Sequence, residues 1–352
     1  AMLPFENSGQ IDLSRDYAGA GMHHNGRKKN WLWQYGWDMA AQFDSRKRYK
    51  NHEGITGAQT LNQDERFQTI GGYGVLETQL NHWRIRGTLR SDWYRISIDD
   101  FYGDSSGNNT IAVVSPSLAI HRQLTAYWDG YLQYSTGYET PALNELSANP
   151  SGETGFNPSL KPQQSSSIEL GLRHNIATFN SQLTLFYTET KNEIIPYETA
   201  QFPGQTFYAN TGRVNRKGIE FESNWTFSST GNIAVSFHYG DYKTVAKKDL
   251  PNVPRKQFSS SLKQHIGRTV LNAQLRYVGS RYANSDNTVE VPRFWTSDMY
   301  VQRSWGMTTW TLGITNIANT SYFDNIRINA FGRRYFEPAA TRLLFLKCLV
   351  SF

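Results

Sequence analysis

The feature that most constrains the fold of this sequence is a two-residue alternation between apolar and polar side chains. In its clearest stretch, residues 31–43, the odd positions are Trp31, Trp33, Tyr35, Trp37, Met39, Ala41 and Phe43. The even positions between them are mostly polar and include Gln34, Asp38 and Gln42. Because successive side chains of a β-strand point to opposite faces, this pattern predicts a strand with one apolar and one polar face.

Similar segments recur along the chain and predict fifteen strands. They lie near residues 11–23, 30–43, 66–79, 83–99, 111–121, 124–136, 165–174, 178–190, 216–228, 232–241, 256–266, 269–281, 293–304, 307–317 and 337–352. The connections near 24–29, 81–82, 122–123, 175–177, 229–231, 267–268 and 305–306 are short, and those between them are long. Short turns at one end and long loops at the other are typical of an all-β, antiparallel up-and-down transmembrane β-barrel.

Composition excludes several other classes. The mean hydropathy is −0.58, and no apolar run approaches the roughly 18 residues of a membrane-spanning helix. A single cysteine cannot form an internal disulfide. Aromatic residues make up 14% of the chain, which argues against a disordered protein because disordered chains lack such surface.

A soluble all-β binding module with two packed sheets would show the same alternation strand by strand. Strand length favours the membrane barrel, because several segments reach the roughly 9–11 residues that cross a bilayer at a tilt. Aromatic pairs at strand ends suit rings that lie among lipid headgroups. These pairs are Trp93-Tyr94, Tyr127-Trp128, Tyr322-Phe323 and Tyr335-Phe336.

The C-terminus predicts a final strand with an apolar outer face. Leu344, Leu346, Cys348, Val350 and Phe352 share one parity, and the last of them is aromatic. The segment resembles the terminal strand by which outer-membrane proteins are recognised for barrel assembly. The alternative is an ordinary buried strand that ends in phenylalanine. The apolar residues of the opposite parity, Leu343, Phe345 and Leu349, depart from the polar lumen face that a barrel should have.

Short motifs lie at the ends of the predicted strands. They are residues 136–141 (TGYETP), 157–162 (NPSLKP), 167–171 (SIELG), 210–213 (NTGR) leading into 218–220 (GIE), 315–317 (TNI) running to Tyr322-Phe323, and 332–338 (GRRYFEP). With them the chain resembles, over nearly its whole length, the C-terminal part of a TonB-dependent outer-membrane transporter. The nearest branch includes siderophore receptors and the pyrroloquinoline quinone receptor. The resemblance implies a protein of the bacterial outer membrane.

In that family the barrel has about 22 strands and a plugged lumen. The plug is an N-terminal domain that carries a short sequence motif, the box, on which the periplasmic partner TonB pulls. This chain shows no plug, no such box and fifteen predicted strands. We therefore expect residues 1–352 to be the C-terminal part of a barrel. A complementary N-terminal chain or segment would supply the plug and the first strands, because unpaired strand edges in lipid are costly.

The function implied by the resemblance is import of a scarce bulky solute. The candidates are a ferric siderophore or similar metal chelate, or a redox cofactor such as pyrroloquinoline quinone. The expected partners are TonB acting through the plug, outer-membrane lipid and lipopolysaccharide, and the small-molecule ligand. The alternative is a passive outer-membrane channel or porin.

Ligand contacts in such receptors come from the extracellular loops. Aromatic rings can stack on conjugated ligands, and guanidinium groups can grip carboxylates. The candidates by position are Tyr102, Tyr138, Glu139, Tyr197, Arg281, Tyr282 and Arg333. The alternative role for each is loop packing, or a place in the aromatic girdle. Glu139 in particular is expected to shape the loop entrance.

Five charged residues are expected to face the lumen: Arg84, Arg86, Arg90, Glu220 and Glu222. Pairing with neighbouring charges is their simplest role. For the three arginines the alternative is contact with a plug or an anionic ligand, and for the two glutamates it is a catalytic pair like that of a glycosidase, which is not favoured. No nucleophile–base set is present, so we expect no enzyme, and we expect no cofactor and no metal site. The net charge of +6 comes without a nucleic-acid motif. The excess fits attraction to phosphorylated lipid headgroups or to an anionic ligand.

Overall fold

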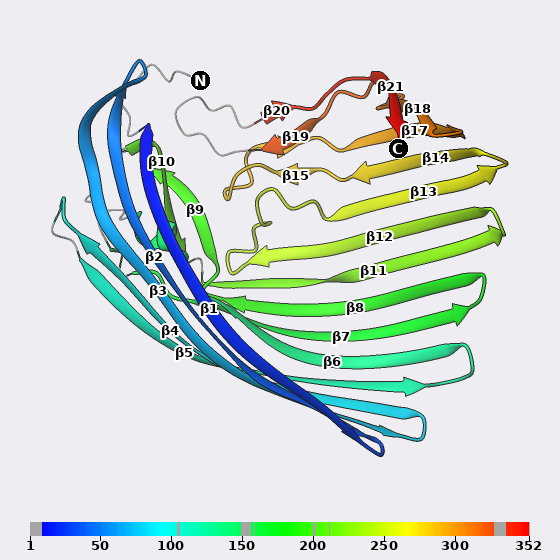
Figure 1. The fold of residues 1–352 in the computed structure, drawn as a ribbon, viewed down its shortest axis with the longest axis horizontal. Coiled ribbons are helices and arrows are strands. Elements are labelled where there is room, and N and C mark those ends of the chain that lie inside the picture. The colour runs from blue at the N-terminus through cyan, green and yellow to red at the C-terminus, as the bar shows by residue number, and fades with distance from the viewer. Residues whose placement is uncertain are drawn as a thin grey trace. The chain divides into compact units, whose positions relative to one another are not determined.

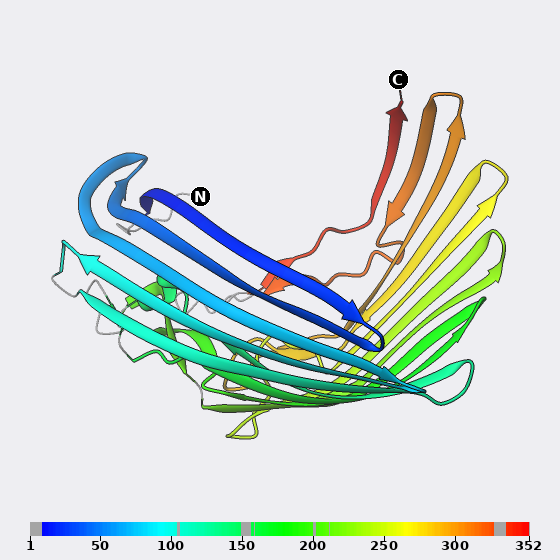
Figure 2. The ribbon, with the colours of Figure 1, turned by 60° about the horizontal axis from the view of Figure 1, so that its bottom comes forward.

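A computed structural model describes residues 9–103, 106–148, 156–157, 159–199, 202–210, 212–326 and 336–351, with the backbone alone at 198–199 and 202–205. Its main element is a sheet of 15 strands that follow one another in chain order (Figures 1 and 2). Every strand pair with a described register is antiparallel. The all-β, up-and-down arrangement that the alternation predicted is therefore confirmed.

The strands of the main sheet correspond one to one with the fifteen predicted segments. They are β1 (Gln10–Lys28), β2 (Trp31–His52), β3 (Ile55–Leu80), β4 (Trp83–Asp100), β5 (Gly107–Gln123), β6 (Trp128–Glu139), β7 (Gln163–Ile176), β8 (Phe179–Lys191), β11 (Arg213–Ser228), β12 (Gly231–Thr244), β13 (Lys256–Ile266), β14 (Thr269–Val278), β17 (Phe294–Trp305), β18 (Thr308–Thr315) and β21 (Leu343–Val350). Among the described residues β1 and β21 are the two ends of this sheet.

The long connections contain further structure. Three are two-stranded hairpins: β9 (Ile194–Thr199) with β10 (Phe202–Asn210), β15 (Arg281–Tyr282) with β16 (Glu290–Val291), and β19 (Phe323–Ile326) with β20 (Phe336–Pro338). A short helix, α1 (Leu143–Leu146), lies between β6 and β7. No helix in the described part of the chain is long and apolar enough to span a membrane.

Two strand boundaries correct the expectations. Residues 44–65 were expected to be a long connection, but β2 continues to His52 and β3 begins at Ile55. The alternation fades there because both faces become polar; for example, Ser45 pairs with Asp64. The last strand was expected over 337–352, but β21 begins at Leu343 and residues 336–338 form β20 in a separate hairpin.

The chain divides into two compact units. Unit 1 comprises Ala1–Ala119, Tyr134–Ser166 and Thr190–Gly212, and unit 2 comprises Ile120–Gln133, Ser167–Glu189 and Arg213–Phe352. The boundaries cut across β5, β6, β7 and β8, so each unit combines strands with loops.

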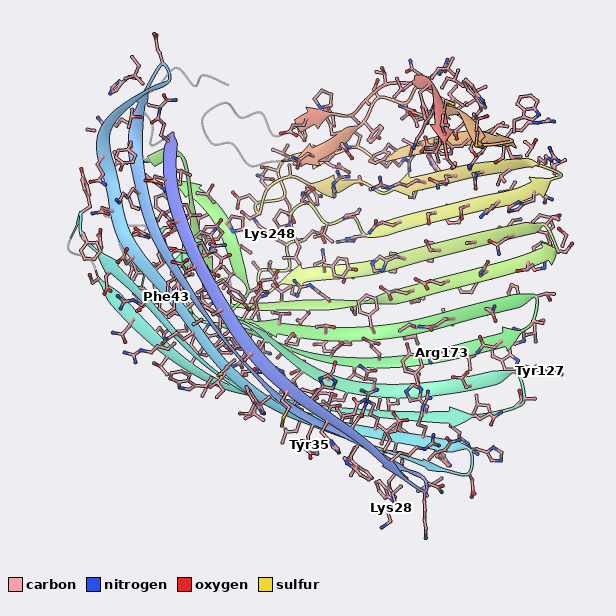
Figure 3. All side chains as sticks on the ribbon, in the orientation of Figure 1. Lys28, Tyr35, Phe43, Tyr127, Arg173 and Lys248 are labelled. Carbon is pink, nitrogen blue, oxygen red and sulfur yellow. The ribbon has the colours of Figure 1, made fainter. Side chains whose placement is uncertain are left out.

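In unit 1 the registers sort the side chains of β2, β3 and β4 into two faces. One face carries apolar rows, such as Trp33–Leu76 and Met39–Ile70–Trp93. The other carries polar rows, such as Asp38–Gly71–Asp92. Tyr35 and Phe43, both labelled in Figure 3, belong to the apolar face and are exposed. The apolar and polar faces predicted for the segment 31–43 are therefore confirmed.

Candidate functional site

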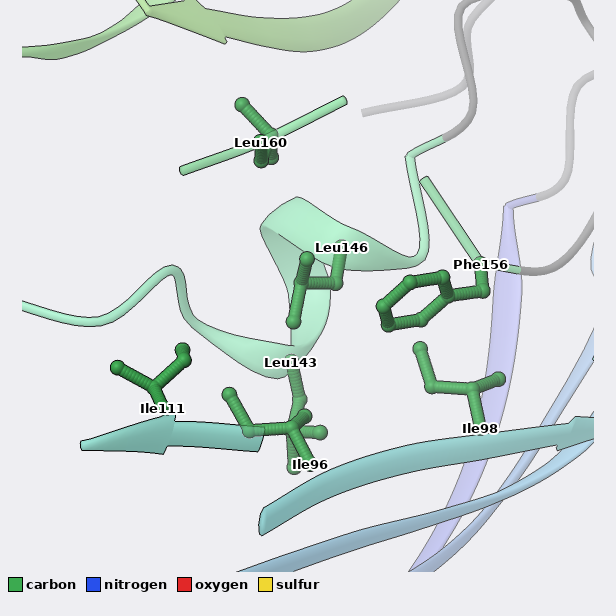
Figure 4. Packing of buried hydrophobic residues seen from close by; sticks show 7 residues of the cluster. All are labelled: Ile96, Ile98, Ile111, Leu143, Leu146, Phe156 and Leu160. Carbon is green, nitrogen blue, oxygen red and sulfur yellow. The ribbon is translucent and has the colours of Figure 1, made fainter. Parts of the chain in front are cut away.

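The loop between β6 and β7 is anchored to the sheet of unit 1 by an apolar cluster. Helix α1 carries Leu143 and Leu146, which pack on Ile96 and Ile98 of β4 (Figure 4). The complete cluster, here named the apolar loop core, is Ile96, Ile98, Ile111, Leu143, Leu146, Phe156 and Leu160. Ile96 and Ile98 are fully buried and Leu146 is 1% exposed, so this loop covers the sheet and is not a free segment.

Asn210 joins this loop to the hairpin of β9 and β10. Its Oδ1 accepts a hydrogen bond from the backbone N–H of Lys161 at 2.8 Å. Its Nδ2 donates to the backbone oxygens of Lys161 at 2.8 Å and Asn192 at 2.7 Å. One side chain therefore fixes the bases of two loops, which explains the NTGR motif as a structural clamp.

A second asparagine of the motifs, Asn157, shapes the same loop. It is 1% exposed, and its Oδ1 accepts hydrogen bonds from the backbone N–H of Ser159 at 3.0 Å and from the Ser159 hydroxyl at 2.5 Å. Its own backbone N–H donates to the Leu146 carbonyl at 2.6 Å. The first residue of the NPSLKP motif thus ties the loop to α1.

The loops of unit 2 are joined by polar contacts around Asp249. Its carboxylate contacts Lys243 at 2.8 Å and Arg255 at 2.6 Å. Its backbone exchanges two hydrogen bonds with the Asn287 side chain, at 2.7 and 2.9 Å. We name Lys243, Asp249, Arg255 and Asn287 the polar loop network. It connects the β12–β13 loop to the β14–β17 loop.

The charges of this network set the acidity of Asp249. Partial burial raises the pKa of the Asp249 carboxyl, but hydrogen bonds from Lys243 and Arg255, together with their charges, outweigh burial. The net pKa therefore lies below the ordinary aspartate value. The hydrogen bond to Asp249 in turn raises the pKa of Arg255 against the opposing effect of its burial. Both groups are charged at neutral pH.

Arg281 bridges three loops of unit 2. Its Nε donates to the Asn252 Oδ1 at 3.1 Å, and its Nη2 reaches the Phe323 carbonyl at 3.5 Å. The residue is 8% exposed, and its Nη1 has no hydrogen-bond partner among the described residues. Burial, followed by repulsion from Arg276, lowers the pKa of this guanidinium. Arg281 is therefore a buried cation that makes no hydrogen bond to a carboxylate in the described part of the chain.

Asn316 of the TNI motif holds the base of the β18–β21 loop. It has a left-handed φ of 49°, which asparagine tolerates better than most residues. Its Nδ2 donates to the Thr320 carbonyl at 2.8 Å, and its Oδ1 accepts from the Thr320 N–H at 2.8 Å. Its backbone N–H donates to Asp298 at 2.7 Å. Like Asn210, it is a loop clamp.

The predicted ligand contacts lie in different environments. Tyr102 follows β4 and is 55% exposed. Tyr138 packs its ring against Tyr94 at 5.5 Å, and its buried hydroxyl has no hydrogen-bond partner among the described residues. The Glu139 carboxylate accepts a hydrogen bond from Gln163 across the loop base. Tyr197 and Phe207 contact each other in the β9–β10 hairpin.

The predicted ligand contacts divide between the two units. Tyr102, Tyr138, Glu139 and Tyr197 belong to unit 1, and the adjacent Arg281 and Tyr282 belong to unit 2. Arg333 lies outside the described residues, as does Phe352 of the terminal strand. Leu344, Leu346 and Val350 lie on β21 and are exposed. Their predicted role in assembly stays a prediction.

The arginines predicted to face the lumen are partly paired. Arg90 contacts Asp38 at 2.9 Å and Asp92 at 2.7 Å, and Arg86 lies 3.9 Å from Glu77. The pairing expected of these arginines is thus present at two of the three, whereas Arg84 makes no ion pair with any described residue. That all three face a lumen stays a prediction.

Glu220 and Glu222 lie on the polar face of β11 in unit 2. Glu220 contacts His238 Nδ1 at 3.1 Å, and the other ring nitrogen of His238 contacts the Tyr242 hydroxyl. Glu222 lines an open cavity of about 390 Å³ together with serine, asparagine and glutamine side chains of β8, β12 and β13. Most of the side chains that line this cavity can form hydrogen bonds. No group of three His, Cys, Asp or Glu suited to a metal ion occurs among the described residues.

Sequence reasoning missed the clamps. Asn157, Asn210 and Asn316 all lie inside motifs that carried the resemblance, so the signal was present. The side chains of Asn157 and Asn316 bond to Ser159 and Thr320 nearby in their own loops, whereas the partners of Asn210 lie in other loop segments. Gly171 of the SIELG motif is a similar case. The ring of Tyr131 lies over it, and a Cβ at this position would stand 1.9 Å from the Tyr131 Cε1. The glycine is therefore required by close packing between strands.

Comparison with known proteins defines the class. The family model described as "TonB dependent receptor-like, beta-barrel" matches residues 4–319. The chain belongs to this family of bacterial outer-membrane β-barrels, as its motifs predicted.

Individual relatives of this chain include receptors and transporters for named solutes. Among curated proteins, the chain is 23% identical to the ferrioxamine receptor of Yersinia enterocolitica over 77% of its own length and 40% of that protein. It is 22% identical to the vitamin B12 transporter BtuB of Vibrio vulnificus, over 76% of its own length and 41% of that protein. The ferric yersiniabactin uptake receptor FyuA of Yersinia pestis superposes with a TM-score of 0.79 at 16% identity. That match covers 97% of this chain and 55% of FyuA.

The chain thus spans about two fifths of the length of these curated relatives. The identity to FyuA is low, so this likeness shows the fold alone. The relatives are named for different solutes.

Proposed function

We propose that this chain forms the C-terminal wall and much of the extracellular loop surface of a TonB-dependent receptor that imports a scarce bulky solute. The observation that carries the proposal is the family match over residues 4–319. The solute is a ferric siderophore or similar metal chelate, or a redox cofactor such as pyrroloquinoline quinone. The passive channel is not favoured, because the matches are to receptors and transporters.

The mechanism requires no covalent chemistry by this chain. The loops capture the solute, TonB remodels the plug with energy from the inner membrane, and the solute passes to the periplasm. Tyr102 and Tyr282 are proposed as direct contacts. The burial of Arg281 and of the Tyr138 hydroxyl supports a role for both residues in holding the loops that carry those contacts. Glu139 keeps the loop entrance in shape through Gln163.

Residues 1–352 are proposed to need a complementary N-terminal chain or segment that supplies the plug and about seven further strands of a 22-stranded barrel. Two observations support this. The chain spans about two fifths of its curated relatives, and β1 and β21 end the sheet in the described part of the chain. Native mass spectrometry tests it: a closed 40 kDa monomer inserted in a membrane would refute the proposal.

Solute uptake tests the import proposal. Cells that lack the gene for this receptor are compared with complemented cells for uptake of labelled ferric siderophores, of cobalamin and of pyrroloquinoline quinone, each with and without TonB. We expect one solute class to enter only when both the receptor and TonB are present. Uptake that persists without TonB, or a large steady conductance of the purified protein, would support a passive channel instead.

A further inference from the structure

The polar face of the sheet in unit 2 ends abruptly at its last strand. On β17 and β18 this face carries hydroxyl and amide side chains, with Gln302 opposite Thr311 and Ser304 opposite Thr309. On β21 the same face carries three apolar side chains, here named the apolar row: Leu343, Phe345 and Leu349. The opposite face of β21 is apolar as well, so the alternation of polar and apolar faces fails on this strand.

The packing around Phe345 shows that the apolar row is held in place by its neighbours. The Phe345 ring lies over Gly313 of β18 and contacts Tyr300 of β17, with ring centroids 6.0 Å apart. A Cβ at position 313 would stand 2.9 Å from the Tyr300 Cδ1 and closer still to the Phe345 ring, so glycine makes room for this ring. Leu343 and Leu349 on either side are 54% and 53% exposed. The strand therefore presents a fixed ring between two exposed leucines.

The chemistry of this face indicates a protein occupant. In a barrel of this family the polar face lines the interior and lipid covers the opposite face. A single exposed leucine on a protein needs no explanation. Here, however, three apolar side chains share one face of one edge strand, and the adjacent strand is polar on that face. Removal of these side chains from water by a packed segment is favourable.

The direction of β21 identifies the segment that can reach the apolar row. The Ser351 N–H donates to the Met307 carbonyl at 2.8 Å, so β21 ends at the short turn between β17 and β18. The strand that closes the barrel onto β21 runs antiparallel to it and begins at that same end. In this family the plug is N-terminal and precedes the first strand. The end of the plug would therefore enter the barrel beside Leu349.

We propose that the apolar row is the docking surface for the last residues of the plug and their connection to the first strand. This segment would pack apolar side chains on Leu343, Phe345 and Leu349. It would also offer a hydrogen-bond acceptor to Lys347, which is exposed between Phe345 and Leu349. The edge position of β21 in the main sheet leaves this surface uncovered in the described part of the chain (Figures 1 and 2). The inference rests on the complementary N-terminal segment proposed above and not on the identity of the solute.

The test is photo-cross-linking in the complete receptor in its membrane. Benzoylphenylalanine is incorporated at position 345 or 349, and the linked peptides are identified by mass spectrometry. We expect both positions to link to residues that directly precede the first strand. Leu346 is the matched control, because it lies on the opposite face of the same strand and is 65% exposed. A cross-linker at 346 should reach lipid or the first strand itself. Links from 345 and 349 that reach only lipid or a second copy of this chain would overturn the proposal.

Hydrogen exchange of the same segment gives a second, independent measurement. The double variant Leu343→Ala, Leu349→Ala removes two side chains that are exposed in this structure, so the sheet itself should fold as before. Exchange of the residues that precede the first strand should become about tenfold faster or more, because the segment loses apolar contacts. Leu346→Ala should leave this exchange unchanged.

Equal exchange in the double variant and the unaltered receptor would overturn the docking surface. An equal acceleration in Leu346→Ala would also overturn it, because the cause would then be a weakened sheet edge. Failure of the proposed complementary segment gives a different result, namely a closed 40 kDa monomer in native mass spectrometry. Solute uptake is measured separately, so failure of the import proposal is distinguished as well.

Discussion

In unit 1 the β6–β7 loop is held on the sheet by the seven apolar side chains of the apolar loop core. In unit 2 the β12–β13 loop is held by Asp249 and the cations and amide around it. Burial of apolar area is non-directional and responds little to pH or salt. Charged hydrogen bonds depend on protonation and are screened where they are exposed. The two loop regions should therefore respond to different perturbations.

The largest effect is expected from a cavity in the apolar loop core. Leu146→Ala removes a side chain that is 1% exposed, and such a truncation costs about 2–5 kcal/mol. Amide hydrogen exchange of residues 143–148 should accelerate strongly, while the β12–β13 loop keeps its protection. Leu89→Ala is the control, because Leu89 is 54% exposed on the apolar face. Similar acceleration in both variants would contradict the packing described for α1.

The next effect is expected at the clamp between two loops of unit 1. Asn210→Ala removes the hydrogen bonds to the Lys161 N–H and to the Lys161 and Asn192 carbonyls, and a typical hydrogen bond contributes about 0.5–1.5 kcal/mol net. Limited proteolysis within the two loops should become faster. Asn210→Asp keeps the acceptor for Lys161 and loses both donated hydrogen bonds, so it should give an intermediate rate. Equal rates for all three proteins would show that Asn210 does not join the loops.

A smaller, pH-dependent effect is expected in the polar loop network. The pKa of Asp249 lies below its ordinary value, so its ionised form stabilises the folded loop. This stabilisation is complete above the unfolded aspartate pKa of about 3.9. It is lost as the pH falls through the lower folded pKa.

Hydrogen exchange of the β12–β13 loop, corrected for the intrinsic pH dependence, should show this loss of protection on acidification. In the variant Asp249→Asn this pH-dependent loss of protection should be absent. The apolar loop core has no ionisable side chain among its seven residues, so its own packing contributes no such loss. If the pH-dependent loss of protection persists in Asp249→Asn, a group other than Asp249 causes it.

The smallest effect is expected from an exposed pair in the same region. Lys248, labelled in Figure 3, lies 3.4 Å from Asp286, and the two side chains are 44% and 75% exposed. Such pairs contribute about 0–1 kcal/mol. Lys248→Ala should change loop protection by no more than that, and high salt should have the same small effect. A larger loss would place Lys248 inside the network instead of at its rim.

The sequence predicted the main sheet well because the two faces of each strand have different chemistry. Trp33, Trp37 and Met39 alternate with Gln34 and Asp38, and the registers place them on opposite faces. The alternation fails beyond Phe43, where β2 and β3 are polar on both faces. For this reason the sequence predicted a long connection over residues 44–65, where the structure has the outer part of the β2–β3 hairpin.

The candidate site was less predictable, because its geometry depends on contacts between distant loops. Asn210 and Lys161 are separated by 49 residues, and no local pattern records that pairing. The aromatic and arginine candidates were chosen by residue type. Type alone could not separate the exposed Tyr102 from the buried Arg281. The family motifs pointed to segments in which Asn210 and Asn316 hold the bases of loops. The ligand contacts predicted in the same motifs stay predictions.

The most direct test of the account is the accessibility of alternate positions along β2 in a lipid bilayer. Spin labels are placed one at a time at Tyr35, Asp38 and Met39 of the complete receptor, in a background with Cys348→Ser. Labels at Tyr35 and Met39 should be relaxed by oxygen, which dissolves in lipid, and the label at Asp38 should respond to a polar relaxant. Equal responses at all three positions would contradict a wall with lipid on one face and a polar interior on the other.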